Sequence, residues 1–323
     1  MRVPRSQLLK DAKSTGCRPE ILEKVIHLLG LLEGFQGHPF LKDRIALKGG
    51  TALNLFLFDV PRLSVDIDLN YIGAADRDSM LAERPKIEQA VQAVASRDGM
   101  TVTRTPTEEH AGGKWLLRYD SSMNDTGTLA VDLNFMYRVA LWPVVRRNSR
   151  RLAAHQAKGI PILDVHELAA GKLAALFSRR ASRDLFDAHG LVCGNESLDW
   201  NLLRVGFLVY GAMNRKDWRT IRLEDLTFDR RDFENELPPV LRHLDTSISL
   251  DEFAERLRTG CREKLAPLLA FTKREREFLD RLLDHGEIVP ELLTADAALA
   301  ARIAAHPMLQ WKALNVKQHK KKA

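Results

Sequence analysis

The sequence predicts an α+β protein in which a part that mixes strands and helices is followed by a mostly helical part. Two observations support this prediction. The segments with the alternating pattern of strands all lie before Pro161, and the patterns from Val165 onward are nearly all helical. The 323 residues suffice for two ordinary domains. We therefore predict one domain at residues 1–163 and a helical C-terminal domain with a basic tail at residues 164–323.

In the first part, apolar residues at helical spacing predict helices at residues 20–35, 52–58 and 78–97. Period-two alternation predicts strands at residues 44–48, 64–71, 101–104, 114–119 and 128–135. Gly49-Gly50 ends the first strand, Thr51 is placed to cap the next helix, and Pro61 separates that helix from the next strand. In the second part, helices are expected at residues 165–178, 183–192, 198–213, 250–258 and 273–285.

Composition narrows the class of protein. Hydrophobic residues make up 45% of the chain, enough for a core, and no stretch reaches the roughly 20 apolar residues of a membrane span. The N-terminus lacks the apolar run of a secretion signal, so we expect a cytoplasmic protein without a membrane partner. The three cysteines lie far apart, without zinc-like spacing, and are expected to be reduced thiols.

The net charge is +6 and the basic residues are clustered. Arg146, Arg147, Arg150 and Arg151 lie close together, and Lys317 opens a basic C-terminal run. Such clusters suit a polyanion, because each neutralised phosphate releases a counterion. A solvated surface run and a frayed tail are the alternative, so charge permits a nucleic-acid partner without identifying one.

The stretch with the clearest chemistry is Ser64-Val-Asp-Ile-Asp-Leu-Asn-Tyr71. On a strand, Asp66 and Asp68 project from the same face, about 7 Å apart. Two such carboxylates repel each other unless a cation lies between them, and hard oxygen ligands suit Mg²⁺. A solvated strand face is the alternative for this pattern taken alone.

Gly49-Gly50-Thr51, between a strand and a helix, supplies the second part of the site. Without Cβ atoms the backbone can approach an anion closely, and the free amides of a helix start favour phosphate. Asp132 supplies a third carboxylate in the apolar run Leu129-Ala-Val-Asp-Leu-Asn-Phe135, where a metal or a nearby cation would offset its burial. Three carboxylates around Mg²⁺ fit phosphoryl or nucleotidyl transfer. A plain turn and an edge aspartate are the alternatives for these two pieces.

Taken together, Lys48-Gly-Gly-Thr-Ala-Leu53 and Arg62-Leu-Ser-Val-Asp-Ile-Asp-Leu-Asn70 resemble the AbiEii-like (MenT-like) nucleotidyltransferase toxins of type IV toxin–antitoxin systems. That family belongs to the DNA polymerase β superfamily, whose signature is a Gly-Gly or Gly-Ser turn, a spacer and an Asp-x-Asp strand. The spacer here is slightly long for the superfamily but is common among AbiEii-like proteins. A second family motif matches between Lys172 and Asp187, so the resemblance covers roughly residues 40–190.

The resemblance implies a polymerase-β-like nucleotidyltransferase domain that uses Mg²⁺ or Mn²⁺ and a nucleoside triphosphate. It implies that the nucleotide phosphates are contacted by Gly49, Gly50, Thr51 and Ser64. It assigns the metal to Asp66, Asp68 and Asp132, with Asp132 also helping to deprotonate the acceptor hydroxyl. Lys172 and Asp187 would be further catalytic or nucleotide-binding residues, and Arg183 offers a fork for phosphate or a carboxylate. We expect Asp184 or Asp187 to anchor Lys172 or Arg183.

The function predicted is transfer of a nucleoside monophosphate to an acceptor hydroxyl, with the 3′ end of tRNA as the expected acceptor and pyrophosphate as the product. A phosphotransferase acting on a protein or small molecule is one alternative, because it needs the same metals and triphosphate. A catalytically silent module that binds RNA or protein is another. An antitoxin encoded alongside is implied. A stable complex with it, phosphorylation of Ser64, the preferred base and the direction in which Lys48 points all stay open.

Overall fold

The computed structural model describes residues 3–106, 111–194, 198–243 and 247–320. The chain forms two compact units, each with its own buried hydrophobic residues. Unit 1 comprises Met1–Arg138, Val144–Leu163 and Pro238–Leu244. Unit 2 comprises Val139–Pro143, Asp164–Leu237 and Asp245–Ala323.

Unit 1 is built on a mixed sheet of seven strands in the order β3-β4-β5-β2-β1-β7-β6. The strands are β1 (Ile45–Lys48), β2 (Asp66–Tyr71), β3 (Thr101–Arg104), β4 (Gly112–Asp120), β5 (Thr126–Asn134), β6 (Val145–Arg147) and β7 (Ile160–Ile162). Strand β2 lies at the centre, where it pairs antiparallel with β1 and parallel with β5. Because paired residues point to the same side of a sheet, this register decides which side chains meet.

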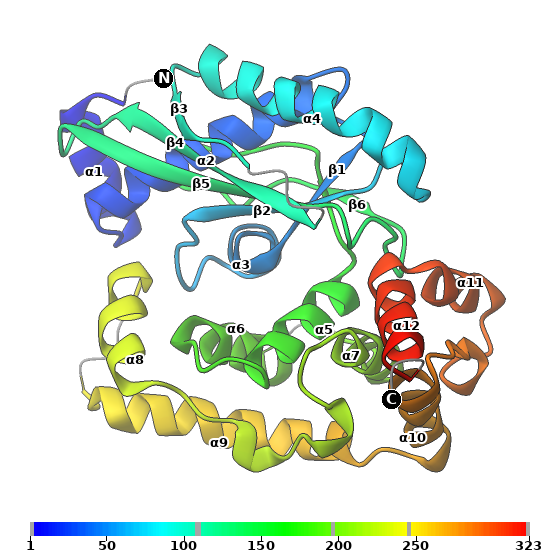
Figure 1. Ribbon diagram of the computed structural model, residues 1–323. Coiled ribbons are helices and arrows are strands. Elements are labelled where there is room, and N and C mark those ends of the chain that lie inside the picture. The colour runs from blue at the N-terminus through cyan, green and yellow to red at the C-terminus, as the bar shows by residue number, and fades with distance from the viewer. Residues whose placement is uncertain (1–2, 107–110, 195–197, 244–246, 321–323) are drawn as a thin grey trace. The chain divides into compact units, whose positions relative to one another are not determined.

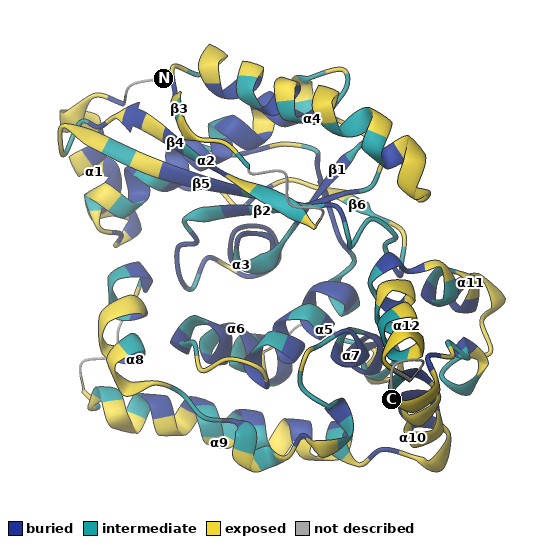
Figure 2. Cartoon of the chain, in the orientation of Figure 1, coloured by how far each residue is buried: buried dark blue, intermediate teal, exposed yellow. Residues whose placement is uncertain are grey.

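The two faces of this sheet differ in chemistry. Ile67 and Leu69 of β2 and Val131 and Leu133 of β5 share one face and are fully or almost fully buried. Helices α2 (Pro19–Gly37) and α4 (Arg77–Arg97) cover that face (Figure 1). Their inward sides are buried and the outward side of α4 is exposed (Figure 2). We call this the apolar face and the other the acidic face.

The acidic face carries the short helix α3 (Gly49–Ala52), which continues as a π-helical turn at Leu53–Leu57 (Figure 1). Helix α1 (Arg5–Thr15) completes the helices of unit 1. A segment distant in sequence also belongs here. The amide of Leu63 donates to the carbonyl of Val240 at 2.7 Å, and the amide of Arg242 donates to the carbonyl of Pro61 at 3.1 Å. These bonds fix the loop that leads into β2.

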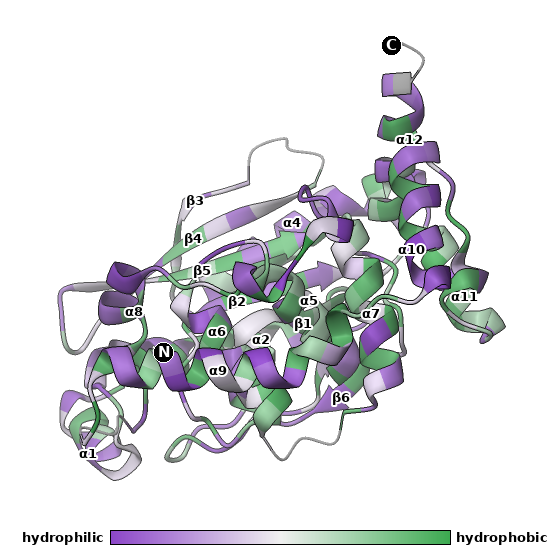
Figure 3. Ribbon diagram, turned by 90° about the horizontal axis from the view of Figure 1, so that it is seen from below, coloured by the Kyte–Doolittle hydropathy of each residue, from purple (hydrophilic) through white to green (hydrophobic). Residues whose placement is uncertain are grey.

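The regular elements in the described part of unit 2 are helices joined by loops, and α5 and α7 contain many hydrophobic residues (Figure 3). Its longer helices are α5 (Val165–Leu176), α6 (Ser182–Cys193), α7 (Trp200–Ala212), α8 (Arg230–Glu236), α9 (Leu250–Leu269), α10 (Lys273–Asp280), α11 (Ala297–Ala305) and α12 (Pro307–Lys320). Phe177, Phe207 and Trp218 pack their rings together in the core, with centroids 5.1–6.1 Å apart.

The predicted α+β class is confirmed, as are all five predicted strands. The prediction missed the three-residue strands β6 and β7 and helices α1, α8, α11 and α12. Three residues are too few to show a period, and α1 and α8 have few apolar side chains. None of the described helices combines the length and the apolar character that a membrane span requires. The three cysteines are free thiols, and the last lysines, Lys321 and Lys322, lie outside the described residues.

Candidate active site

The three predicted aspartates of unit 1 lie on neighbouring strands of the same sheet. Asp68 of β2 is directly opposite Asp132 of β5, and Asp66 is opposite Ala130 in the same register. Adjacent strands are about 4.8 Å apart, so the carboxylates of Asp68 and Asp132 are close neighbours on the acidic face. Asp66 projects from that face two residues away. We call these three side chains the acid row.

Two lysines flank the acid row. Lys48 of β1 is opposite Asp68, and Lys114 of β4 is opposite Asp132. The order Lys48, Asp68, Asp132, Lys114 therefore crosses four strands on one face. This settles the orientation of Lys48, which faces the site. Burial raises the pKa of Asp132 and the charge of Asp68 raises it further, whereas Lys48 and Lys114 act in the opposite direction. The half-buried Asp132 is thus held between like and unlike charges.

Gly49 is required by its contact with Asp68. Its φ of +72° lies in the left-handed region, which disfavours any residue with a Cβ atom. A Cβ atom added there would lie 2.3 Å from Oδ2 of Asp68. The glycine therefore lets the chain turn from β1 into α3 directly against the carboxylate. The sequence predicted that Gly49 lets the backbone approach a phosphate. The structure shows in addition that Gly49 lies against Asp68 of the acid row.

Thr51 joins the glycine turn to the strand that carries the aspartates. Its side chain is buried, and its hydroxyl donates to the main-chain carbonyl of Asp66 at 2.5 Å. The hydroxyl proton is therefore used within the protein. The main-chain amides of Gly49, Gly50 and Thr51 lie in the first turn of α3, where no partner within the helix is available to them. Ser64, also buried, precedes Asp66 in the loop that leads into β2.

The chemistry of the acid row suits a hard cation. Among the residues described, no three histidine, cysteine or acidic side chains are grouped so as to hold a metal ion by themselves. Mg²⁺ is usually bound by one or two carboxylates together with water and substrate phosphates, instead of by a cage made of protein alone. The facing pair Asp68 and Asp132 matches that requirement, and Asp66 stands beside it.

In unit 2, the second predicted motif forms a buried charge cluster. Nζ of Lys172 lies 2.9 Å from Asp184 Oδ1 and 2.8 Å from Asp187 Oδ2. Arg179 also contacts Asp184, with Nη2 3.0 Å from Oδ1. Lys172 and Arg179 hold the pKa of Asp184 below its usual range, although burial opposes them. The expectation that these aspartates anchor Lys172 is confirmed.

Arg183 lies apart from this Lys172 cluster. Its Nη2 is 3.6 Å from Oε2 of Glu236, and both side chains are substantially exposed. The start of α6 is held instead by α8, because the amide of Ser182 donates to Asp232 at 2.6 Å. Arg183 is therefore paired with Glu236 in this structure, and its side chain is partly exposed.

The clustered arginines, whose charge in the sequence suits a polyanion, are partly used within unit 1. Arg146 donates to Asp43 at 2.7 Å and to the carbonyls of Lys42 and Gly159. Arg150 donates to the carbonyls of Leu57 and Phe58 and lies 3.1 Å from Asp59. These contacts connect β6 and the following loop to the rest of unit 1. They give both arginines a structural role that the clustering of charge in the sequence did not reveal.

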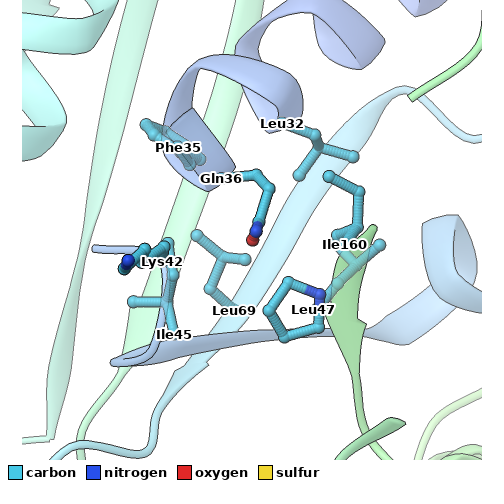
Figure 4. Close-up of a pocket in the computed structure, with 9 residues that line it drawn as sticks. Leu32, Phe35, Gln36, Lys42, Ile45, Leu47, Leu69 and Ile160 are labelled. Carbon is cyan, nitrogen blue, oxygen red and sulfur yellow. The ribbon is translucent and has the colours of Figure 1, made fainter. Parts of the chain in front are cut away.

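A small cavity in unit 1 and a buried glutamate in unit 2 lie outside the acid row and the Lys172 cluster. A small cavity between α2, β1 and β7 is lined mainly by apolar side chains, including Leu32, Leu47 and Leu69 (Figure 4). It lies on the apolar face, because Leu47 and Leu69 alternate with Lys48 and Asp68.

Glu167 of α5 is buried in unit 2, where it accepts hydrogen bonds from Tyr210 at 2.9 Å and from the amide of Leu141 at 3.0 Å. Sequence reasoning missed Glu167, since its partners are remote.

Comparison with known proteins identifies the fold and the family of this chain. A search of curated proteins finds no match. The solved structure of MenT4, a nucleotidyltransferase toxin from Mycobacterium tuberculosis, is similar to this chain with a TM-score of 0.63 and 19% identity, over 93% of this chain and 99% of that one. This likeness confirms the predicted fold. Residues 31–259 match the family described as "Nucleotidyl transferase AbiEii toxin, Type IV TA system". The chain therefore belongs to the AbiEii family of nucleotidyltransferase toxins, whose type IV systems pair a toxin with an antitoxin.

Proposed function

We propose that this nucleotidyltransferase transfers a nucleoside monophosphate from a triphosphate to a hydroxyl of RNA, with the 3′ end of tRNA as the expected acceptor. The observation that carries the proposal is the register that sets Asp68 opposite Asp132, with Gly49 against Asp68. This arrangement gathers negative charge beside a turn whose free amides suit phosphate. A triphosphate would match the free amides of the turn, and the cation bound to it would match the negative charge of the acid row.

In the reaction, the acceptor oxygen attacks the α-phosphorus, the bond from that phosphorus to the bridging oxygen of the β-phosphate breaks, and pyrophosphate leaves. Asp132, which faces Asp68 across the two strands, takes the hydroxyl proton as the general base. The amides of Gly49, Gly50 and Thr51 hold the phosphates, with Ser64 beside them. Asp66, Asp68 and Asp132 would hold Mg²⁺ or Mn²⁺, which when bound neutralises charge on the phosphates.

Lys172 and Asp187 enter the proposal through the family motif, as catalytic or nucleotide-binding groups, and Arg183 enters as a nucleotide-binding group. The Lys172 cluster supports a defined position for the ammonium, because Asp184 and Asp187 fix it from two sides. To bind a phosphate, the guanidinium of Arg183 has to give up its contact with Glu236. Charge neutralisation by such groups is a large part of catalysis in phosphate transfer.

The test incubates purified protein with Mg²⁺, total tRNA and each α-labelled triphosphate in turn, beside Asp66→Ala. The proposal expects label on RNA with wild-type protein and none with the variant. The γ-labelled triphosphates distinguish the phosphotransferase alternative, because a kinase leaves γ-label on its product and a nucleotidyltransferase releases it in pyrophosphate. Metal-independent binding of RNA without any transfer would instead favour a silent binding module.

A further inference from the structure

We propose that the acceptor RNA is bound along a basic track on the acidic face of strands β3 and β4. The track consists of Arg104, Lys114 and Arg118. This inference rests on the proposed transfer to RNA and adds to it the surface that holds the acceptor. The track is distinct from the arginines at residues 146–151, whose clustered charge in the sequence also suits a polyanion.

Register places all three basic side chains on the same face as the acid row. Lys114 of β4 is directly opposite Asp132, and Arg118 is opposite Thr128 of β5. On the edge strand β3, Arg104 is opposite Leu116, which lies between Lys114 and Arg118 on their face. The basic residues thus occupy the two strands that follow the acid row toward the β3 edge.

The track is available to a ligand. Arg104, Lys114 and Arg118 are all exposed, and none of them forms an ion pair with any carboxylate among the residues described. Asp120, exposed on the same face, ends the track at the far end of β4. The track thus combines two arginines that have no carboxylate partner among the described residues with Lys114, whose charge also acts on Asp132, in a surface that a phosphate backbone can neutralise.

The spacing connects this surface to the proposed chemistry. Lys114 and Arg118 are four residues apart, about 13 Å along β4, and Lys114 is one strand from Asp132, about 5 Å. A polynucleotide whose phosphates contact Arg118 and then Lys114 is therefore led toward the acid row. Its terminal hydroxyl is the group that the transfer requires at that place.

The arginine cluster is a weaker candidate for the same ligand. Arg146 and Arg150 are bonded within unit 1, as described above. Arg147 lies on β6, at the opposite edge of the sheet, and its register through Val145, Ile162 and Leu47 places it on the apolar face. A phosphate backbone on Arg147 would lie across the sheet from the acid row.

A pair of matched double variants tests the track. Arg104→Gln/Arg118→Gln and Arg147→Gln/Arg151→Gln each remove two exposed positive charges from unit 1, and neither changes the acid row. Binding of labelled tRNA is measured at several salt concentrations, and thermal unfolding midpoints verify that both variants are folded. The track variant should lose at least about tenfold in affinity at low salt, and its slope of log K against log salt should be less steep by about 1.4–1.8. The control should keep the wild-type slope.

The outcomes separate this inference from the proposed function. Label transfer from α-labelled triphosphate to tRNA is followed in the same samples. If wild-type protein transfers label and the track variant keeps wild-type affinity and slope, the track is overturned while the transferase proposal stands. A larger loss in the Arg147/Arg151 variant would overturn the track as well. A wild-type protein that transfers no label and binds no tRNA would overturn both.

Discussion

The acid row of unit 1 and the Lys172 cluster of unit 2 use the same residue type in opposite ways. The aspartates of the acid row are half-buried, and two of them, Asp68 and Asp132, lie opposite each other on neighbouring strands. The aspartates of the Lys172 cluster are almost wholly buried, and both contact one ammonium group at 2.8–2.9 Å. In the first region negative charge is incompletely balanced, and in the second it is balanced within the protein.

This difference shows where each region obtains its counter-charge. A buried carboxylate without a cation is costly, so the aspartates of α6 require Lys172 for the fold itself. The acid row tolerates its excess charge because it is partly solvated and is flanked by Lys48 and Lys114. An external cation and a triphosphate can therefore still add to the acid row. Removing one charge from the acid row should therefore lower transfer activity, whereas removing one from the Lys172 cluster should lower the free energy of unfolding.

The largest effect is expected for Asp68→Asn, which keeps the shape of the side chain and removes its charge. Transfer activity should fall by at least about 10⁴-fold, as when one member of a catalytic unit is removed. The free energy of unfolding should stay within about 0.5 kcal/mol, since no buried partner is left unpaired. Steady-state transfer kinetics and urea unfolding measure the two quantities. A folded variant with wild-type activity would remove Asp68 from the site.

The next largest effect is expected for Lys172→Met, which leaves Asp184 and Asp187 without their shared cation. The free energy of unfolding should fall by about 3–5 kcal/mol, the usual cost of breaking a buried ion pair. Lys172→Arg keeps the charge and should recover part of the loss. Urea unfolding of the three proteins makes the comparison, and unchanged stability in Lys172→Met would contradict a structural role for this cluster.

A smaller effect is expected on the pH dependence of the free energy of unfolding, through Glu167 of unit 2. Burial raises the pKa of Glu167 to about 7, against the pull of its hydrogen bonds from Tyr210 and the amide of Leu141. The folded state thus binds this proton more tightly than the unfolded state. The contribution of the protonated Glu167 carboxyl to the free energy of unfolding is fully present below about pH 4.5 and is lost as pH rises through 7.

Glu167→Gln should therefore remove part of the pH dependence, on the order of 1–3 kcal/mol between pH 4.5 and 8. Urea unfolding at several pH values provides the measurement, with the exposed Glu33→Gln as the control. If the Glu167 variant and wild type show parallel pH profiles, the carboxyl does not titrate as its burial implies.

The smallest effect is expected for Gly49→Ala. Strain at a φ of +72° should cost about 1–2 kcal/mol, and the new methyl group should displace the carboxylate of Asp68 and lower transfer activity. Gly37→Ala is the matched control, because nothing lies within 4 Å of a Cβ atom there at the end of α2. That variant should gain up to about 1 kcal/mol and keep full activity. Equal behaviour of the two variants would contradict a specific role for Gly49.

Much of the sheet could be predicted because its chemistry is local. Period-two alternation identified β2 and β5. The helix after β1 was expected from Ala52 with Thr51 as its cap, but α3 begins at Gly49 with Lys48 as its N-cap, because the left-handed φ of Gly49 lets the chain turn at once. The pairing of Asp68 with Asp132 could not be derived this way, because it depends on a parallel register between strands more than 50 residues apart. The same limit applies to Lys114, whose position opposite Asp132 appears only once the strands are paired.

Other features depend on partners that no local pattern encodes. The bonds that hold Arg146 and Arg150 run to main-chain carbonyls elsewhere in unit 1, so a charge cluster in the sequence looked available when part of it was not. The Pro238–Leu244 segment joins unit 1 although helices of unit 2 precede and follow it. The Lys172 cluster was easier to anticipate, since Asp184 and Asp187 lie three residues apart on one helix.

The most direct test of the central claim, that the acid row provides the cation site, is Mn²⁺ binding followed by electron paramagnetic resonance with a non-hydrolysable triphosphate present. The wild-type protein and the control Gly37→Ala should bind the ion, whereas Asp68→Asn should bind it at least tenfold more weakly, by about 1.4 kcal/mol or more. Equal Mn²⁺ binding by Asp68→Asn and wild type would contradict the account.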